Sequence, residues 1–151
     1  MMLFLTLFFL IYYVVLLVKG NFFQGVRIAM GEDEIKKQKL GMDNYKPDSD
    51  LVIKTLLLML FIIPFSITII IYLCVATQYD LLKYPTLGLL VYYTVSLMWG
   101  FIKGKTKIDL SSEDKIEKYR KKLQRKRTLK GTLLQLIWVA YFGYMAYMLV
   151  L

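Results

Sequence analysis

The stretch from Thr55 to Tyr79, TLLLMLFIIPFSITIIIYLCVATQY, contains no charged side chain. Three further stretches of similar length are also free of charge: Met1–Val18, Tyr84–Ile102 and Gly131–Leu151. An α-helix needs roughly 20 residues to cross ~30 Å of hydrocarbon. Backbone groups in lipid must be hydrogen-bonded within their own segment, so each stretch is predicted to be a helix. The sequence therefore predicts an all-α integral membrane protein with four transmembrane helices.

The four predicted spans and their connections use nearly the whole chain of 151 residues. A soluble domain usually takes at least about 50 residues, so we expect one membrane domain over residues 1–151, with connecting segments 19–54 and 103–130. No basic side chain precedes the first stretch, and Lys19 follows it. Secretory signals have the opposite charge order, so the first stretch is predicted to be an uncleaved span.

Basic residues are distributed unevenly over the connections. Segment Lys19–Lys54 contains seven, Asp80–Lys83 contains one, and Lys103–Lys130 contains twelve. Lys and Arg favour the cytoplasmic side of short loops. The first and third connections are therefore predicted to be cytoplasmic and both chain ends to lie outside (N-out/C-out). We expect a multi-pass protein of the bacterial cytoplasmic membrane.

The segment Lys115–Lys130 carries nine basic residues and a single acid, Glu117. Ile116, Tyr119 and Leu123 fall on one helical face, which predicts a basic amphipathic helix leading into the fourth span. A basic side chain near an anionic leaflet is worth about 1 kcal/mol. The residues expected to bind anionic lipid headgroups or a protein partner are Lys115, Lys118, Arg120, Lys121, Lys122, Arg125, Lys126, Arg127 and Lys130.

The first connection is predicted to contain a short helix between Gly31 and Gly41. Its acids, Glu32–Glu34, come first and its bases, Lys36–Lys39, come last, which is the order that a helix dipole favours. Gly41 is a suitable helix end. The acids are an expected internal partner for the basic helix.

The residues that usually carry catalysis are scarce. There is one cysteine, Cys74, and no histidine, which excludes the usual zinc sites and Ser/His/Asp triads. No predicted span contains an ionisable acid or base, in contrast to proton relays and ion-coupled transporters. We therefore expect a protein that is not an enzyme and has no cofactor. No base-reading motif accompanies the positive charge, so nucleic acid is not an expected partner. Pro64, inside the second span, is either a packing kink or a functional feature, namely a hinge or a polar notch lining a cavity.

The stretch Asn21–Ile28, NFFQGVRI, follows the first predicted span and precedes Glu34–Lys37 and the pair Tyr45-Lys46. This order resembles the first cytoplasmic loop of small Gram-positive membrane proteins related to the SdpI-type bacteriocin-immunity group. The resemblance covers about Asn21–Lys46, and Gly25 and Arg27 are the matching motif positions. It implies a non-enzymatic protein that protects the membrane or senses an agent acting on it.

The first functional hypothesis is thus an accessory or immunity-type membrane protein. Two alternatives stay open: a phage holin-like pore former, and a subunit of a larger transporter or secretion complex. The expected partners are the lipid bilayer, its anionic headgroups, and a protein partner or a second copy of the chain.

Overall fold

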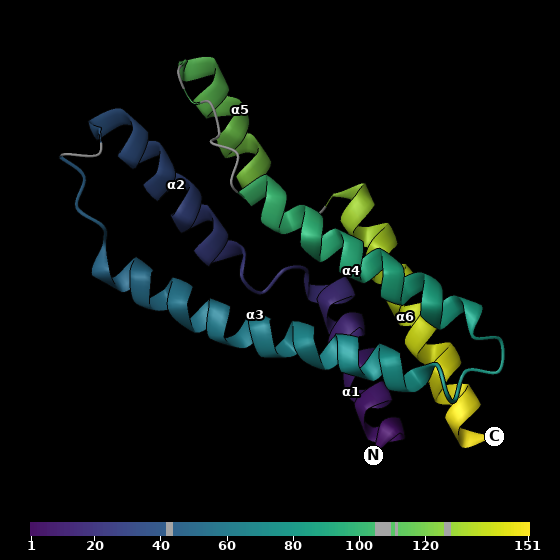
Figure 1. The fold of residues 1–151 in the computed structure, drawn as a ribbon. Helices are drawn as coiled ribbons and strands as arrows, with labels where there is room; N and C mark the ends of the chain where they lie inside the picture. The colour runs from purple at the N-terminus through teal and green to yellow at the C-terminus, as the bar shows by residue number, and fades with distance from the viewer. Residues whose placement is uncertain (42–43, 105–109, 111, 126–127) are drawn as a thin grey trace. The chain divides into compact units, whose positions relative to one another are not determined.

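The computed structural model describes residues 1–41, 44–104, 110, 112–125 and 128–151. Every regular element in these ranges is an α-helix (Figure 1). The helices are α1 (Met2–Lys19), α2 (Gln24–Leu40), α3 (Ser49–Ala76), α4 (Tyr84–Gly104), α5 (Glu113–Gln124) and α6 (Leu129–Val150). The prediction of an all-α fold is confirmed for the described residues.

Three segments are long and apolar enough to cross a membrane: α1, α3, and a segment within residues 113–150 whose apolar part is α6. These stretches match three of the four predicted spans. Helix α4 covers the remaining predicted span, and over the described residues it is not one of these three stretches.

Contacts within the chain define two compact units. The first contains Met1–Gly20, Ile63–Lys107 and Leu129–Leu151, and the second contains Asn21–Ile62 and Ile108–Thr128. Helix α3 contributes its first half to the second unit and its second half to the first. The expectation of a single membrane domain remains a prediction.

The core of the first unit is aromatic. Phe9 of α1 stacks on Phe142 of α6 with ring centroids 5.3 Å apart, and Tyr13 stacks on Trp138 at 5.4 Å. Tyr72 of α3 closes this cluster against Phe9 at 5.4 Å. All five side chains are buried. Stacked and edge-on ring pairs hold α1, α3 and α6 together by packing, which is the main force between helices in lipid.

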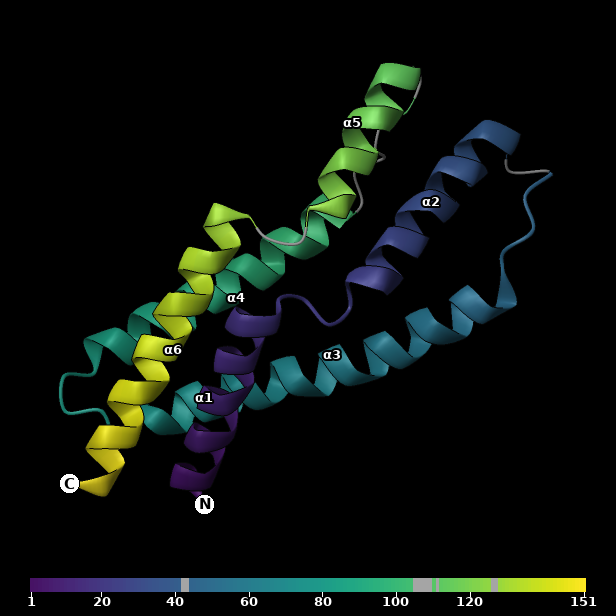
Figure 2. The same cartoon turned by 180° about the vertical axis from the view of Figure 1, so that it is seen from behind.

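In the second unit, α2 and α5 run side by side (Figures 1 and 2). Ile35 of α2 is buried with Ile116 of α5 and with Leu110. Helix α2 ends at Leu40 and is followed by Gly41, whose φ of 75° is the left-handed conformation that glycine favours, so the predicted helix end is confirmed. The start was predicted wrongly, since α2 begins at Gln24 and runs through Gly31.

The basic helix and the last span are separate helices. Helix α5 ends at Gln124, and Arg125 has an extended backbone with φ −64° and ψ 110°. Helix α6 begins four residues further on, at Leu129. Pro64 lies inside α3 without ending it, and the question of whether it acts as a hinge remains a prediction.

Candidate functional site: the α2–α5 helix pair

The basic residues predicted to bind lipid or protein are exposed wherever the structure describes them. Five lie on α5 (Lys115, Lys118, Arg120, Lys121 and Lys122), and Arg125 follows its last turn. Lys130 lies in the first turn of α6 and thus belongs to the other unit. Lys126 and Arg127 lie outside the described residues.

The apolar stripe predicted on α5 is confirmed, and it faces α2. Ile116 and Leu123 are buried, and Tyr119 packs against the same cluster. This stripe is therefore already covered by protein. Helix α5 has no second apolar face to insert among lipid tails, so any contact with a bilayer must be made by its charged side chains.

The two helices lie in close contact at Gly31. A Cβ atom added there would overlap Cδ1 of Leu123 and lie 3.2 Å from its Cγ. Leu123 thus fills the space that a side chain at position 31 would occupy. Gly25, the glycine of the resemblance motif, is different, since a Cβ there would meet nothing within 4 Å. The structure offers no packing reason for a glycine at position 25.

Arg27, the arginine of the same motif, caps the end of α5. Its Nη2 donates to the carbonyl oxygens of Leu123 at 3.0 Å and Lys122 at 3.5 Å. Gln24 adds a bond from Nε2 to the carbonyl oxygen of Gln124 at 3.1 Å. The last carbonyls of a helix have no partner within the helix, and their partial negative charge favours a cation. Two α2 side chains therefore complete the C-terminus of α5.

An ion pair joins the two helices nearer the middle of α5. Arg120 donates from Nε and Nη2 to the two carboxylate oxygens of Glu32, at 2.7 and 2.8 Å. The hydrogen bonds from Arg120 lower the pKa of Glu32 despite its partial burial, helped by the charges of Arg120, Lys36 and Lys39. Of the three acids expected to face the basic helix, Glu32 does so through this pair. Asp33 instead accepts a hydrogen bond from the Tyr45 hydroxyl.

The first unit contains a buried carboxylate that the sequence analysis did not single out. Asp80, in the connection between α3 and α4, is only 2% exposed. Its Oδ1 accepts from the Tyr144 hydroxyl at 2.8 Å and the Leu82 N–H at 3.1 Å. Its Oδ2 accepts from the Thr86 hydroxyl at 2.6 Å and the Thr86 N–H at 3.3 Å. Asp80 therefore ties the start of α4 to α6.

Burial alone would raise the pKa of Asp80, but the hydrogen bonds from Thr86, Tyr144 and Leu82 outweigh it and lower the pKa. The Thr86 hydroxyl also lies 2.9 Å from the hydroxyl of Tyr141, so the cluster continues into α6. An isolated acid between two apolar stretches usually indicates a solvated loop. Asp80 could have been identified by its position shortly before a helix start, where carboxylates commonly cap backbone N–H groups.

Over the residues that the structure describes, no group of three or more His, Cys, Asp and Glu side chains could hold a metal ion. Cys74 is exposed. The geometry of the α2–α5 pair thus offers charged and hydrogen-bonding surface for recognition. Comparisons with family models, with curated proteins and with solved structures give no match to this chain.

Proposed function

We propose that this chain is a non-enzymatic membrane protein of the accessory or immunity type. In this proposal α1, α3, α4 and α6 cross the bacterial cytoplasmic membrane, both chain ends lie outside, and α5 rests on anionic lipid headgroups. The observation that supports it most directly is that the apolar side chains of α5 pack on α2, while its basic side chains are exposed.

Two of the basic residues on α5 that were predicted to bind lipid are already in ion pairs. Arg120 is engaged by Glu32, and Lys121 by Glu117 at 2.7 Å. Lys118, Lys122 and Arg125 recur at i, i+4 and i+7 and therefore share one face. Within the described residues no carboxylate is paired with them. We name these three residues the basic stripe and expect them to contribute most of the attraction to an anionic leaflet.

The test uses a fluorophore on a cysteine at Ser112→Cys, in a Cys74→Ser background, with the protein in nanodiscs. Anionic lipid should shield the fluorophore from aqueous iodide, and added salt should reverse this shielding because it screens surface charge. Changing the basic stripe to glutamine should abolish the effect of anionic lipid. Changing Lys36, Lys37 and Lys39 of α2 to glutamine is the matched control and should leave most of the shielding by anionic lipid. Equal losses in both triple variants would refute the role of the basic stripe.

Orientation is tested separately with impermeant thiol reagents on intact cells. A cysteine at Leu81→Cys should react, since the connection between α3 and α4 is proposed to face outward. One at Ser112→Cys should react only after the membrane is permeabilised. The reverse pattern would overturn the proposed topology without bearing on the basic stripe.

The immunity role predicts a change in cell survival. Loss of the protein should make cells more sensitive to membrane-active peptides, and the basic-stripe variant should restore resistance poorly.

The two alternatives predict other outcomes. A pore former would kill cells on induction and release dye from liposomes, and a complex subunit would co-purify with a partner at fixed stoichiometry.

A further inference from the structure

Cations from both helices of the α2–α5 pair meet at Glu32, on one flank of the second unit. Arg120 of α5 donates from Nε and Nη2 to the two carboxylate oxygens of Glu32, at 2.7 and 2.8 Å. Lys36 and Lys39 follow Glu32 by four and seven residues on α2, so they share its helical face. Their charges add to the hydrogen bonds from Arg120 in lowering the pKa of Glu32. One carboxylate therefore lies among three cations.

The positive charge around Glu32 is not balanced. Three cations and one carboxylate leave an excess of two positive charges among these groups. Within the described residues, neither Lys36 nor Lys39 is in an ion pair. The neighbouring acid of α5, Glu117, is paired with Lys121 at 2.7 Å. This flank therefore favours a further anion.

The pair between Glu32 and Arg120 is open to water. The Arg120 side chain is 47% exposed and the Glu32 side chain 34%. Exposed ion pairs are weak, because water solvates both charges. The planar fork of an arginine matches two oxygens of a phosphate as well as those of a carboxylate. A phosphomonoester carries about −1.5 to −2 charges at pH 7, so it can displace the single charge of Glu32 from Arg120.

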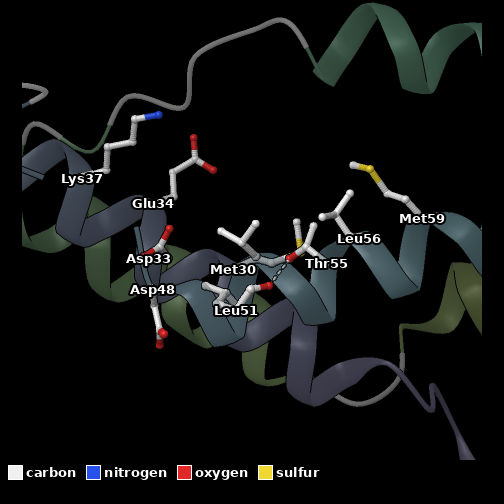
Figure 3. Close-up of a pocket in the computed structure, with 10 residues that line it drawn as sticks. Met30, Asp33, Glu34, Lys37, Asp48, Leu51, Thr55, Leu56 and Met59 are labelled. Carbon is white, nitrogen blue, oxygen red and sulfur yellow. Dashed lines mark hydrogen bonds between the residues drawn. The ribbon is translucent and has the colours of Figure 1, made fainter. Parts of the chain in front are cut away.

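The charged side chains of α2 that face α3 are arranged differently. Asp33, Glu34 and Lys37 line a groove against α3 together with Asp48 (Figure 3). The Asp48 carboxylate is turned away from Glu34, and its Oδ1 accepts the Asp50 N–H at 3.1 Å. These carboxylates do not converge on one point, in contrast to the cations around Glu32.

We propose that Arg120, Lys36 and Lys39 bind the phosphate of a soluble phosphomonoester. Until that phosphate binds, Glu32 occupies the site as an internal carboxylate. Two phosphate oxygens then accept from Nε and Nη2 of Arg120, as the carboxylate does in its absence. A third oxygen accepts from the ammonium group of Lys36 or Lys39. Hydrogen bonds between charged partners are roughly twice as strong as neutral ones.

The geometry of α5 favours a soluble ligand over a lipid. Arg120 lies two residues from Lys118 and from Lys122. At about 100° per residue, it is turned roughly 200° away from the basic stripe. With the basic stripe on the headgroups, Arg120 faces the aqueous side. The choice of a soluble source thus rests on the proposed function, whereas the choice of binding residues does not.

The experiment uses the full-length protein in nanodiscs of zwitterionic lipid, without phosphate buffer, and azidophenyl phosphate as a photoreactive probe. Mass spectrometry should locate the label on α2 and α5 in excess of the label on α4 and α6. Methyl phosphate should compete with the probe, and dimethyl phosphate, which has a single negative charge, should not. Equal competition by dimethyl phosphate would overturn the proposal, because it would show no preference for a dianion.

A second arm tests the source of the phosphate. Phosphatidic acid in the nanodiscs, at an equal concentration of phosphomonoester, should compete no better than methyl phosphate. Stronger competition by phosphatidic acid would support the three binding residues but overturn the soluble source.

Paired variants test whether Glu32 occupies the site. Glu32→Gln removes the internal competitor and should raise labelling about threefold, the effect of one exposed ion pair. Glu117→Gln removes the same charge from the pair with Lys121 and should change labelling little. Arg120→Gln should lower labelling at least about tenfold, because it removes charged hydrogen bonds. Equal increases in Glu32→Gln and Glu117→Gln would overturn the proposal, because net charge alone would explain them.

A last pair of variants separates this site from the basic stripe. Lys36→Gln with Lys39→Gln should lower labelling several-fold. Lys118→Gln with Lys122→Gln removes the same charge from the other side of α5 and should leave labelling unchanged. Equal losses in both pairs would overturn the proposal. Because the basic stripe is tested by lipid shielding and this site by probe labelling, either proposal can fail without the other. Circular dichroism checks that each variant keeps its helices.

Discussion

Asp80→Asn tests whether the buried carboxylate holds the start of α4 against α6. Each oxygen of Asp80 accepts two hydrogen bonds, so replacing either one by an NH₂ group removes two acceptor positions. The hydroxyl of Tyr144 or Thr86 can turn and accept from the new NH₂ group. The backbone N–H of Leu82 or Thr86 cannot, and it is left facing another donor.

The expected loss of stability follows from the number of hydrogen bonds that Asp80→Asn removes. A hydrogen bond to a charged group is worth ~1.5–3 kcal/mol, and an unsatisfied buried donor costs ~1–3 kcal/mol. We expect Asp80→Asn to lower the free energy of unfolding by about 2–4 kcal/mol. Tyr144→Phe removes one of the four donors and should destabilise less. Tyr147→Phe is the matched control, because Tyr147 is 65% exposed on the same helix, and it should change stability by less than ~0.5 kcal/mol.

The assay is reversible unfolding in mixed micelles, followed by circular dichroism. The double variant Asp80→Asn with Tyr144→Phe should be less destabilised than the sum of the two single variants, because each single variant already removes the charged hydrogen bond between Tyr144 and Asp80. If Asp80→Asn were as stable as the original protein, the hydrogen bonds to Asp80 would contribute nothing and the reasoning would be refuted.

Three further predictions concern pH and the α2–α5 pair. Because the pKa of Asp80 is lowered from 3.8 in the folded protein, its stabilisation is fully present above that value and is lost as the pH falls through the folded pKa. The difference in unfolding free energy between the original protein and Asp80→Asn should therefore stay constant from neutral pH to about pH 5 and shrink in stronger acid. A difference that grew in acid would contradict a lowered pKa of Asp80 in the folded protein. Gly31→Val should separate α2 from α5 and speed amide hydrogen exchange in both helices, whereas Gly25→Val, with open space around it, should not; equal effects would show that close approach at Gly31 does not matter. Arg27→Gln should speed exchange in the last turn of α5 by several-fold, consistent with a loss of ~1 kcal/mol of capping, and Lys39→Gln at the far end of α2 is the control; unchanged exchange in Arg27→Gln would rule out the cap.

Local patterns predicted the features that depend on near neighbours along the chain. The length of the charge-free stretches predicted helices over α1, α3, α4 and α6, because a helix satisfies its backbone internally. Gly41 marked the end of α2, since few residues other than glycine adopt a φ of 75° readily. The spacing of Ile116, Tyr119 and Leu123 identified the face of α5 that packs on protein.

The sequence by itself therefore determined that the chain is helical, where most of its apolar faces lie, and where its positive charge collects. Only the tertiary structure decided what Arg27 and Asp80 do. Arg27 caps carbonyls 95 and 96 residues away, and Asp80 accepts from a tyrosine 64 residues away. Periodicity reports which side of a helix is apolar, but not which helix covers it. A polar side chain's role depends on the donor or acceptor that packing brings to it, and for these two residues that partner comes from a distant part of the chain.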